Sequence, residues 1–186
     1  MELFQAIYGR QSIGKVKPDP VPQPLIERAL AAAVQTPNHH HVRPWRFFVL
    51  SGTARNRLGD VMAQSLRQKQ PDIAEQALEV ERARPLRAPV LVAVAVDQPS
   101  EPKVIEIENV CAAAAAAQNL LLAVHAQGLA GMWRTGPAAT DPQVKAFLGL
   151  APEQHLIGFI YIGYPDGEWA PKERPSYEDR TVWLEQ

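Results

Sequence analysis

Two short segments near the N-terminus carry side chains that could bind a charged or planar ligand. Arg10-Gln11-Ser12 follows a helical stretch and places a guanidinium two residues from a hydroxyl. Such a pair can bind an anion and a neighbouring polar edge. An arginine there also complements the dipole of the preceding helix, so an exposed helix end is the simpler explanation on local grounds.

The second segment is the histidine run His39–His41, between Asn38 and Pro44-Trp45. Adjacent side chains point in different directions and rarely converge on one metal ion, and no HExxH motif or carboxylate cluster lies nearby. A polar loop whose amides and imidazoles meet a ligand fits better, and His39 or His40 is suited to proton donation near neutral pH. A histidine-dependent metal site is the alternative.

The segment Gly128–Gly136 places three glycines around Trp133-Arg134-Thr135. Glycine lets the backbone approach a flat or phosphorylated ligand closely. The segment follows a helix and runs into a strand, which is the reverse of the order in a Rossmann GxGxxG motif, so that site is disfavoured. A helix C-cap is sufficient to explain Gly128.

Near the C-terminus, Lys172 and Arg174 are alternate residues of a proline-rich stretch. In an extended chain they share one side and would form a phosphate clamp, although a solvated tail explains them as well. The sequence contains no GxSxG elbow and no P-loop. Cys111 opens an alanine-rich helix, where we expect a small buried residue.

Hydrophobic periodicity and turn residues predict the elements that would position these segments. Helices are expected at Glu2–Tyr8, Pro22–Val34, Thr53–Lys69, Asp72–Arg82, Ile105–Gln127 and Asp141–Leu148. Strands are expected at Arg46–Leu50, Ala88–Val96, Ala130–Arg134 and Leu156–Gly163. Ala88–Val96 has no polar residue, which predicts burial on both faces. Residues 1–186 therefore read as a single α+β or mixed α/β domain. The aromatic-bearing tail Glu168–Gln186 would pack on its own domain or across a partner.

Composition limits the class of protein. The chain has 186 residues, of which 46% are hydrophobic and 21% charged, a balance typical of a globular protein. Nineteen Lys and Arg against 20 Asp and Glu give a net charge of −1, which argues against nucleic-acid binding. One cysteine excludes an internal disulfide and a multi-cysteine zinc site. Without an export signal or an apolar run long enough to span a bilayer, we expect a cytoplasmic protein with no membrane partner.

The order of these segments resembles the nitroreductase-like family of FMN flavoproteins, especially its short bacterial members. The matching pieces are Arg10-Gln11-Ser12, Ala31–Leu50, Ala114–Gly136, Leu156–Pro165 and Lys172–Trp183. The resemblance implies an α+β fold with a central, mostly antiparallel sheet flanked by helices. It also implies an intertwined homodimer with FMN at the subunit interface, in which the long alanine-rich helix is the central dimer helix.

The resemblance further implies a set of cofactor-binding residues. Those expected at the flavin phosphate, the ribityl chain and the ring edge are Arg10, Gln11, Ser12, Lys172 and Arg174. The loop that would reach the flavin from the other subunit contains Gln35, Asn38 and His39. The segment beside the isoalloxazine would be Trp133, Arg134, Thr135 and Gly136, with Ala123–Gly128 flanking the nicotinamide.

Two residues depart from the family pattern. Gln11 replaces a common second arginine, and Gly14 stands where the family often has a lysine near the pyrimidine edge of the flavin. Lys15 follows it, so the sequence leaves open which cation stabilises the reduced flavin.

The implied activity is that of an FMN-dependent NAD(P)H oxidoreductase. NADH or NADPH would deliver hydride to FMN, and a nitroaromatic, a quinone or a similar small acceptor would then enter the same pocket, giving ping-pong kinetics. No side chain need act as a catalytic nucleophile, and no metal is expected. The alternative is a flavin-binding sensor or store with little reductase turnover. The choice between NADH and NADPH and the identity of the acceptor stay open.

Overall fold

A four-stranded sheet forms the centre of the computed structural model, which describes residues 1–170 and 172–184. Its strands lie in the spatial order β1 (Trp45–Ser51), β2 (Val90–Val96), β4 (His155–Gly163) and β3 (Ala130–Arg134). Each neighbouring pair is antiparallel. The prediction of an α+β fold with a mostly antiparallel sheet is confirmed.

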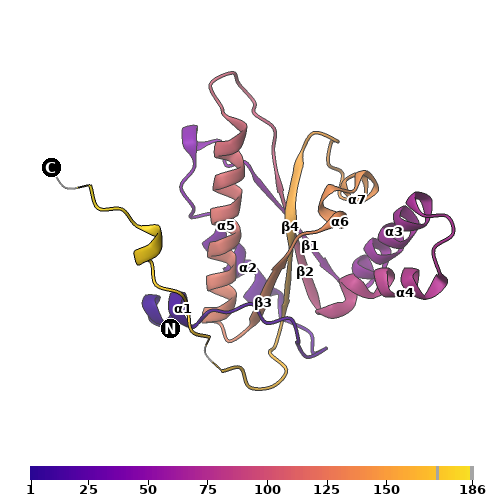
Figure 1. The fold of residues 1–186 in the computed structure, drawn as a ribbon, viewed down its shortest axis with the longest axis horizontal. Helices are drawn as coiled ribbons and strands as arrows, with labels where there is room; N and C mark the ends of the chain where they lie inside the picture. Colours follow the sequence, from indigo (N-terminus) through magenta and orange to yellow (C-terminus); the bar gives the residue numbers. More distant parts are fainter. Residues whose placement is uncertain (171, 185–186) are drawn as a thin grey trace.

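Helices cover both faces of this sheet (Figure 1). One face carries α1 (Leu3–Gly9), α2 (Gln23–Ala33) and α5 (Glu106–Ala126). The other carries α3 (Thr53–Lys69), α4 (Glu75–Ala83), α6 (Pro137–Thr140) and α7 (Pro142–Phe147). Three short 3-10 helices complete the described chain: η1 (His39–His41), η2 (Arg84–Arg87) and η3 (Glu178–Arg180).

Strand β2 is buried on both faces, as its unbroken run of apolar residues predicts. Val90, Val92, Val94 and Val96 belong to the core beneath α2 and α5. Leu91, Ala93 and Ala95 belong to the core beneath α3 and α7. This division follows from the alternation of side chains along a strand.

Helix α5 packs closely on the sheet because its inward face is built of alanines. Ala112, Ala113, Ala116 and Ala117 are buried there. Cys111 is exposed, contrary to the prediction, because it shares the opposite face of the helix with Ala115. Among the described residues, α5 is the one helix long and apolar enough to cross a membrane, and its inner face forms part of the protein core.

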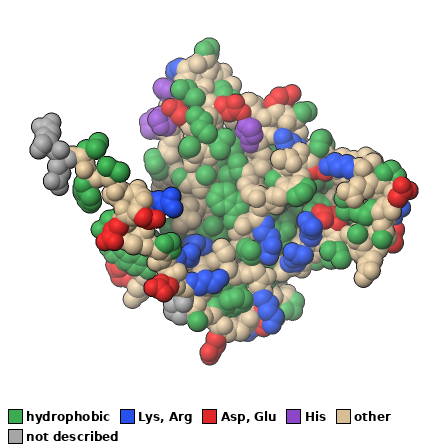
Figure 2. All heavy atoms as spheres, viewed as in Figure 1, with side chains coloured by type: hydrophobic (Ala, Val, Ile, Leu, Met, Phe, Trp, Pro, Cys, Tyr) green, Lys and Arg blue, Asp and Glu red, His purple; other side chains and the backbone are tan. Residues whose placement is uncertain are grey.

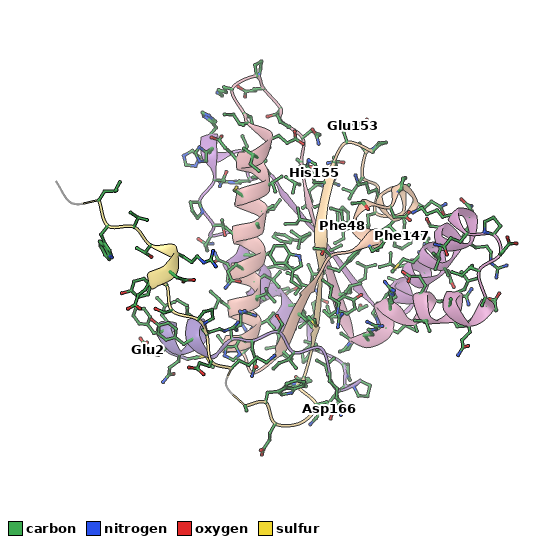
Figure 3. All side chains as sticks on the ribbon, in the orientation of Figure 1. Glu2, Phe48, Phe147, Glu153, His155 and Asp166 are labelled. Atoms are coloured by element: carbon green, nitrogen blue, oxygen red, sulfur yellow. The ribbon has the colours of Figure 1, made fainter. Side chains whose placement is uncertain are left out.

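The segment that follows α1 lies alongside the edge strand β3 and extends the sheet on that side. Ser12 forms a parallel bridge with Gly131, and Val16 forms an antiparallel bridge with Pro165. Lys15 pairs with Asp166 at 2.9 Å, near the lower end of the sheet in Figure 3. These contacts hold residues 10–16 along the outer edge of the sheet.

The C-terminal tail leaves this edge, passes α1 and then runs away from the body of the protein (Figure 1). The side chains of Trp183 and Leu184 are 77% and 92% exposed. The sequence predicted that the tail packs either on its own domain or across a partner. For Trp183 and Leu184, packing on their own domain is not found.

Candidate functional site

A cluster of basic side chains lies where α1 ends. Arg10 caps α1 through its backbone N–H, and Arg174 Nη2 donates to the carbonyl oxygen of Arg10 at 3.1 Å. Partial burial and then the charge of Arg174 lower the pKa of the Arg10 guanidinium. The Arg174 guanidinium thus lies against the backbone of Arg10, 164 residues earlier in the sequence, and within electrostatic range of the Arg10 guanidinium. Lys172 is exposed on the same segment as Arg174.

The imidazole of His125, near the end of α5, joins this cluster. A Cβ atom placed on Gly9 would lie 3.2 Å from His125 Nε2, so the ring packs against the last turn of α1. Partial burial and then the charge of Arg10 lower the pKa of His125. The sequence placed His125 only within Ala123–Gly128, the segment expected to flank the nicotinamide. No spacing links it to Arg10, and the fold brings α1 and α5 together.

Gln11 and Ser12 continue the site along the edge of β3. Gln11 Nε2 donates to the carbonyl oxygen of Ala170 at 3.1 Å, which fixes the tail against the first segment. The other amide atom, Gln11 Oε1, is buried and accepts no hydrogen bond from the described residues. Ser12 is exposed beside Gly131. The sequence-predicted residues Arg10, Gln11, Ser12 and Arg174 therefore meet at one place.

At the other end of β3, Trp133 and Arg134 face opposite sides of the sheet. Trp133 Nε1 donates to the carbonyl oxygen of Ile157 at 3.0 Å, so this indole has a structural partner. Arg134 lies over the ring of Tyr161, with 5.7 Å between its Cζ and the ring centroid. A Cβ atom on Gly14 would lie 3.1 Å from Arg134 Nη2, so the guanidinium occupies the space beside the missing side chain. Thr135 and Gly136 follow and are exposed.

The loop that contains Gln35, Asn38 and His39 lies elsewhere. Asn38 Oδ1 accepts from the Arg43 N–H at 2.8 Å, and Gln35 Nε2 donates to the Ala31 carbonyl at 3.2 Å. His39 Nδ1 is 3.4 Å from Glu108 Oε1, at the start of α5. Together with Ile107, Cys111 and Ala115, the loop lines an open depression of about 470 Å³.

This loop has a strained backbone. His40, His41 and Arg43 have φ values of 53°, 54° and 51°. Residues other than glycine adopt this left-handed region at a cost of about 1 kcal/mol or more each. Such strain is maintained only where surrounding structure requires it, and it often marks a binding segment. The described residues contain no cluster of three or more His, Cys, Asp or Glu side chains that could hold a metal ion.

The two groups of predicted site residues lie far apart within one chain. His39 lies beside Glu108, whereas Arg10 lies beside His125, 17 residues further along α5. At a rise of about 1.5 Å per residue, the two groups are separated by roughly 25 Å. A ligand that contacts both groups in the same chain would have to span about that distance.

Comparisons with known proteins agree with this fold. The nitroreductase family profile matches residues 7–164. The Escherichia coli K12 protein named "Putative NAD(P)H nitroreductase YdjA" is 30% identical over 166 residues, which are 89% of each chain.

Two solved structures share the architecture. A nitroreductase-like family protein from Bacillus cereus superposes with a TM-score of 0.83 at 25% identity, over 100% of this chain and 97% of that one. A Bacteroides fragilis nitroreductase with bound FMN gives a TM-score of 0.74 at 22% identity, over 100% of both chains. Because the profile covers most of the sequence, the chain belongs to the nitroreductase family.

Proposed function

We propose that residues 1–186 form a single-domain, FMN-dependent NAD(P)H oxidoreductase. The observation that carries this proposal is the basic cluster of Arg10, Arg174 and His125 at the edge of β3. Guanidinium groups bind phosphate strongly, and an imidazole beside them adds a further donor. The names of the relatives support the cofactors, since one is named as an NAD(P)H nitroreductase and another contains FMN.

The residues along β3 fit the parts of FMN in sequence. Arg10, Arg174 and the exposed Lys172 would bind the phosphate, and the Ser12 hydroxyl would donate a further hydrogen bond. Gln11 Oε1, which accepts no hydrogen bond from residues 1–170 and 172–184, is an acceptor, and this suits a ribityl hydroxyl rather than a phosphate oxygen. A Cβ atom on Gly14 would lie 2.9 Å from Met132 Sδ and 3.1 Å from Arg134 Nη2, so the glycine lets both side chains lie against the backbone that a flat ring would face.

Arg134 is the candidate for the cation that Gly14 cannot supply. Its guanidinium lies where a side chain at position 14 would extend. A fixed positive charge there would stabilise negative charge on a reduced ring. When bound, FMN would supply the redox chemistry, taking hydride from NADH or NADPH and passing electrons to a nitroaromatic, quinone or similar small acceptor by a ping-pong mechanism.

A homodimer would bring the two separated groups together. The outer face of α5 exposes Ile107, Cys111 and Ala115, and two such faces that cross in opposite directions would bury each other. The N-terminal half of one α5, with the Gln35–His39 loop, would then approach the C-terminal half of its partner, where Arg10 lies. The exposed Trp183 and Leu184 are suited to cover the partner subunit.

The visible spectrum of the purified protein tests this proposal, recorded before and after anaerobic addition of NADH or NADPH. We expect a flavin spectrum that bleaches with at least one of the two. A flavin spectrum that persists with both would favour a flavin sensor or store. A colourless protein that does not take up added FMN would overturn the flavin proposal.

A further inference from the structure

Three arginines converge on a second depression, outside the cluster at Arg10. Arg84 and Arg87 come from η2, Arg134 comes from β3, and together with Thr135 and Tyr161 they line a space of about 100 Å³. We call this space the arginine depression. Figure 2 shows basic side chains gathered between the middle of the molecule and the α3–α4 layer.

The charges in the arginine depression are poorly balanced. Arg84 Nε pairs with Glu81 Oε2 at 2.8 Å. Within residues 1–170 and 172–184, neither Arg87 nor Arg134 forms an ion pair with a carboxylate. Burial raises the pKa of Tyr161, and all three arginines act in the opposite direction, so each lies within electrostatic range of the phenol. Like charges held together destabilise a fold unless something compensates them.

The volume and the donors of the arginine depression indicate the kind of group that would compensate these charges. The space of about 100 Å³ is several times the ~10–15 Å³ that one ordered water molecule needs. It is therefore large enough for a phosphate or a carboxylate group. Guanidinium groups match both anions with paired hydrogen bonds, and the Tyr161 hydroxyl and the Thr135 hydroxyl offer further donors.

The position of the arginine depression links it to the site along β3. Ser12 bridges to Gly131, and Arg134 is three residues further along the strand. At about 3.3 Å per residue, the arginine depression begins roughly 10 Å from the Ser12 end of the site. It is thus separate from the Arg10 cluster, yet Arg134 and Thr135 belong to the segment proposed to lie beside the flavin ring.

We propose that the arginine depression binds an anionic group, a phosphate or a carboxylate, on the molecule that exchanges electrons with the flavin. This inference rests on the proposed flavin function. Two sources would supply such a group. One is the ribose phosphate that distinguishes NADPH from NADH, and the other is an acid group on an aromatic acceptor.

The first test does not depend on reduction of the flavin. Inorganic phosphate is added to the FMN-loaded protein at fixed ionic strength, with chloride as the control, and the arginine Nε–Hε resonances are followed by NMR. We expect phosphate to shift the resonances of Arg84 and Arg87, whereas chloride does not. Identical responses to both anions, or no response, would overturn the proposal.

The second test identifies the source with Arg87→Gln, at an exposed residue outside the proposed flavin contacts. Its matched control is Arg57→Gln on α3, an arginine that contacts Phe147 and does not line the arginine depression. Stopped-flow measurements give the dissociation constants of NADPH and NADH for reduction of the flavin, and of 4-nitrobenzoate and nitrobenzene for its reoxidation.

If Arg87→Gln raises the dissociation constant of NADPH about tenfold or more and leaves that of NADH unchanged, the arginine depression binds the ribose phosphate. The same rise in the dissociation constant of 4-nitrobenzoate, with that of nitrobenzene unchanged, would show that the depression binds the acid group of the acceptor. Equal effects on all four ligands, or none, would contradict the inference. If the wild-type flavin is not reduced at all, the proposed function fails, and the phosphate titration alone decides whether the arginine depression binds anions.

Discussion

At the scale of single residues, the contact between Arg10 and Arg174 is the basis for predicting what the edge of the sheet binds. The Arg174 guanidinium contacts the backbone of Arg10 and the two positive charges repel each other, so both would stabilise an anion bound between them. We expect Arg174→Gln to weaken FMN binding by about tenfold or more, because a hydrogen bond to a charged group contributes ~1.5–3 kcal/mol. Fluorescence titration of FMN measures this effect.

Arg180→Gln is the control for that change, since Arg180 lies in the same tail and pairs with Asp179. Its FMN affinity should equal that of the wild type. An Arg174→Gln variant with unchanged affinity would show that the phosphate binds elsewhere.

His125 provides a second prediction at this scale, based on pH. Its pKa is lowered by partial burial and by the charge of Arg10, below the ordinary value of 6.5. The unfolded chain therefore binds more protons in the window between the two values, and His125 favours folding more as pH rises through that window to about 6.5. A bound FMN phosphate would oppose the charge of Arg10, so we expect loading with FMN to raise the pKa of His125. NMR titration of the imidazole measures it, and an identical titration with and without FMN would contradict the placement of the phosphate.

The sequence predicted some of the proposed site residues and missed others. Arg10, Ser12 and Arg174 were predicted from local patterns and a family resemblance, and the fold brings their two segments together. His125 was expected only as part of Ala123–Gly128, beside the nicotinamide, and Arg87 has no such pattern. The roles proposed for them depend on which elements become neighbours, and that information lies in long-range packing rather than in spacing along the chain.

At the scale of elements, a β-bulge in β4 positions the end of β3. The register between β2 and β4 shifts between Val94 and Ala95, opposite Gly158. Gly158 has a φ of 135°, and a Cβ atom there would lie 2.5 Å from both the Arg134 carbonyl and Trp133 Nε1. The bulge therefore requires glycine, and it orients the Ile157 carbonyl that accepts from Trp133.

Gly158→Ala should therefore lower the free energy of unfolding by about 2 kcal/mol or more, by overpacking and by loss of the Trp133 hydrogen bond. Gly52→Ala is the matched control, because Gly52 also has a positive φ of 52° but no atom within 4 Å of the position that a Cβ would take. The free energy of unfolding of Gly52→Ala should fall by only about 1 kcal/mol. Urea denaturation followed by tryptophan fluorescence compares the two. Equal losses would show that crowding at Gly158 is unimportant.

Most helices and all four strands could be predicted from local patterns of hydrophobic and turn residues, although the short helix α6 was missed. The predicted strand Ala130–Arg134 and the predicted helix Thr53–Lys69 coincide with β3 and α3. The bulge could not be predicted, since Gly158 lies inside an otherwise regular apolar run. The exposure of Cys111 was missed for a related reason. An alanine-rich helix has weak amphipathic contrast, so its sequence does not show which face packs on the sheet.

At the scale of the whole molecule, the separation of roughly 25 Å between the elements that carry His39 and Arg10 is the basis for proposing that a partner subunit completes the cofactor site. If the loop of one chain completes the site of its partner, dimer formation and FMN binding must be thermodynamically linked. Ala115→Arg would place a charge in the centre of the exposed α5 face, beside Cys111. We expect this variant to be monomeric in sedimentation velocity and to bind FMN at least tenfold more weakly, because a buried unpaired charge is costly.

Ala83→Arg, at an exposed alanine at the end of α4, is the control and should remain dimeric and fully loaded. The oligomeric state and the FMN affinity must change together, since the proposal attributes both to one interface. A monomeric Ala115→Arg variant with undiminished FMN affinity would show that Arg10, Ser12 and Arg174 bind the cofactor without the partner's loop. A wild-type protein that is monomeric yet holds FMN tightly would lead to the same conclusion. The strained backbone at His40, His41 and Arg43 would then need a different explanation.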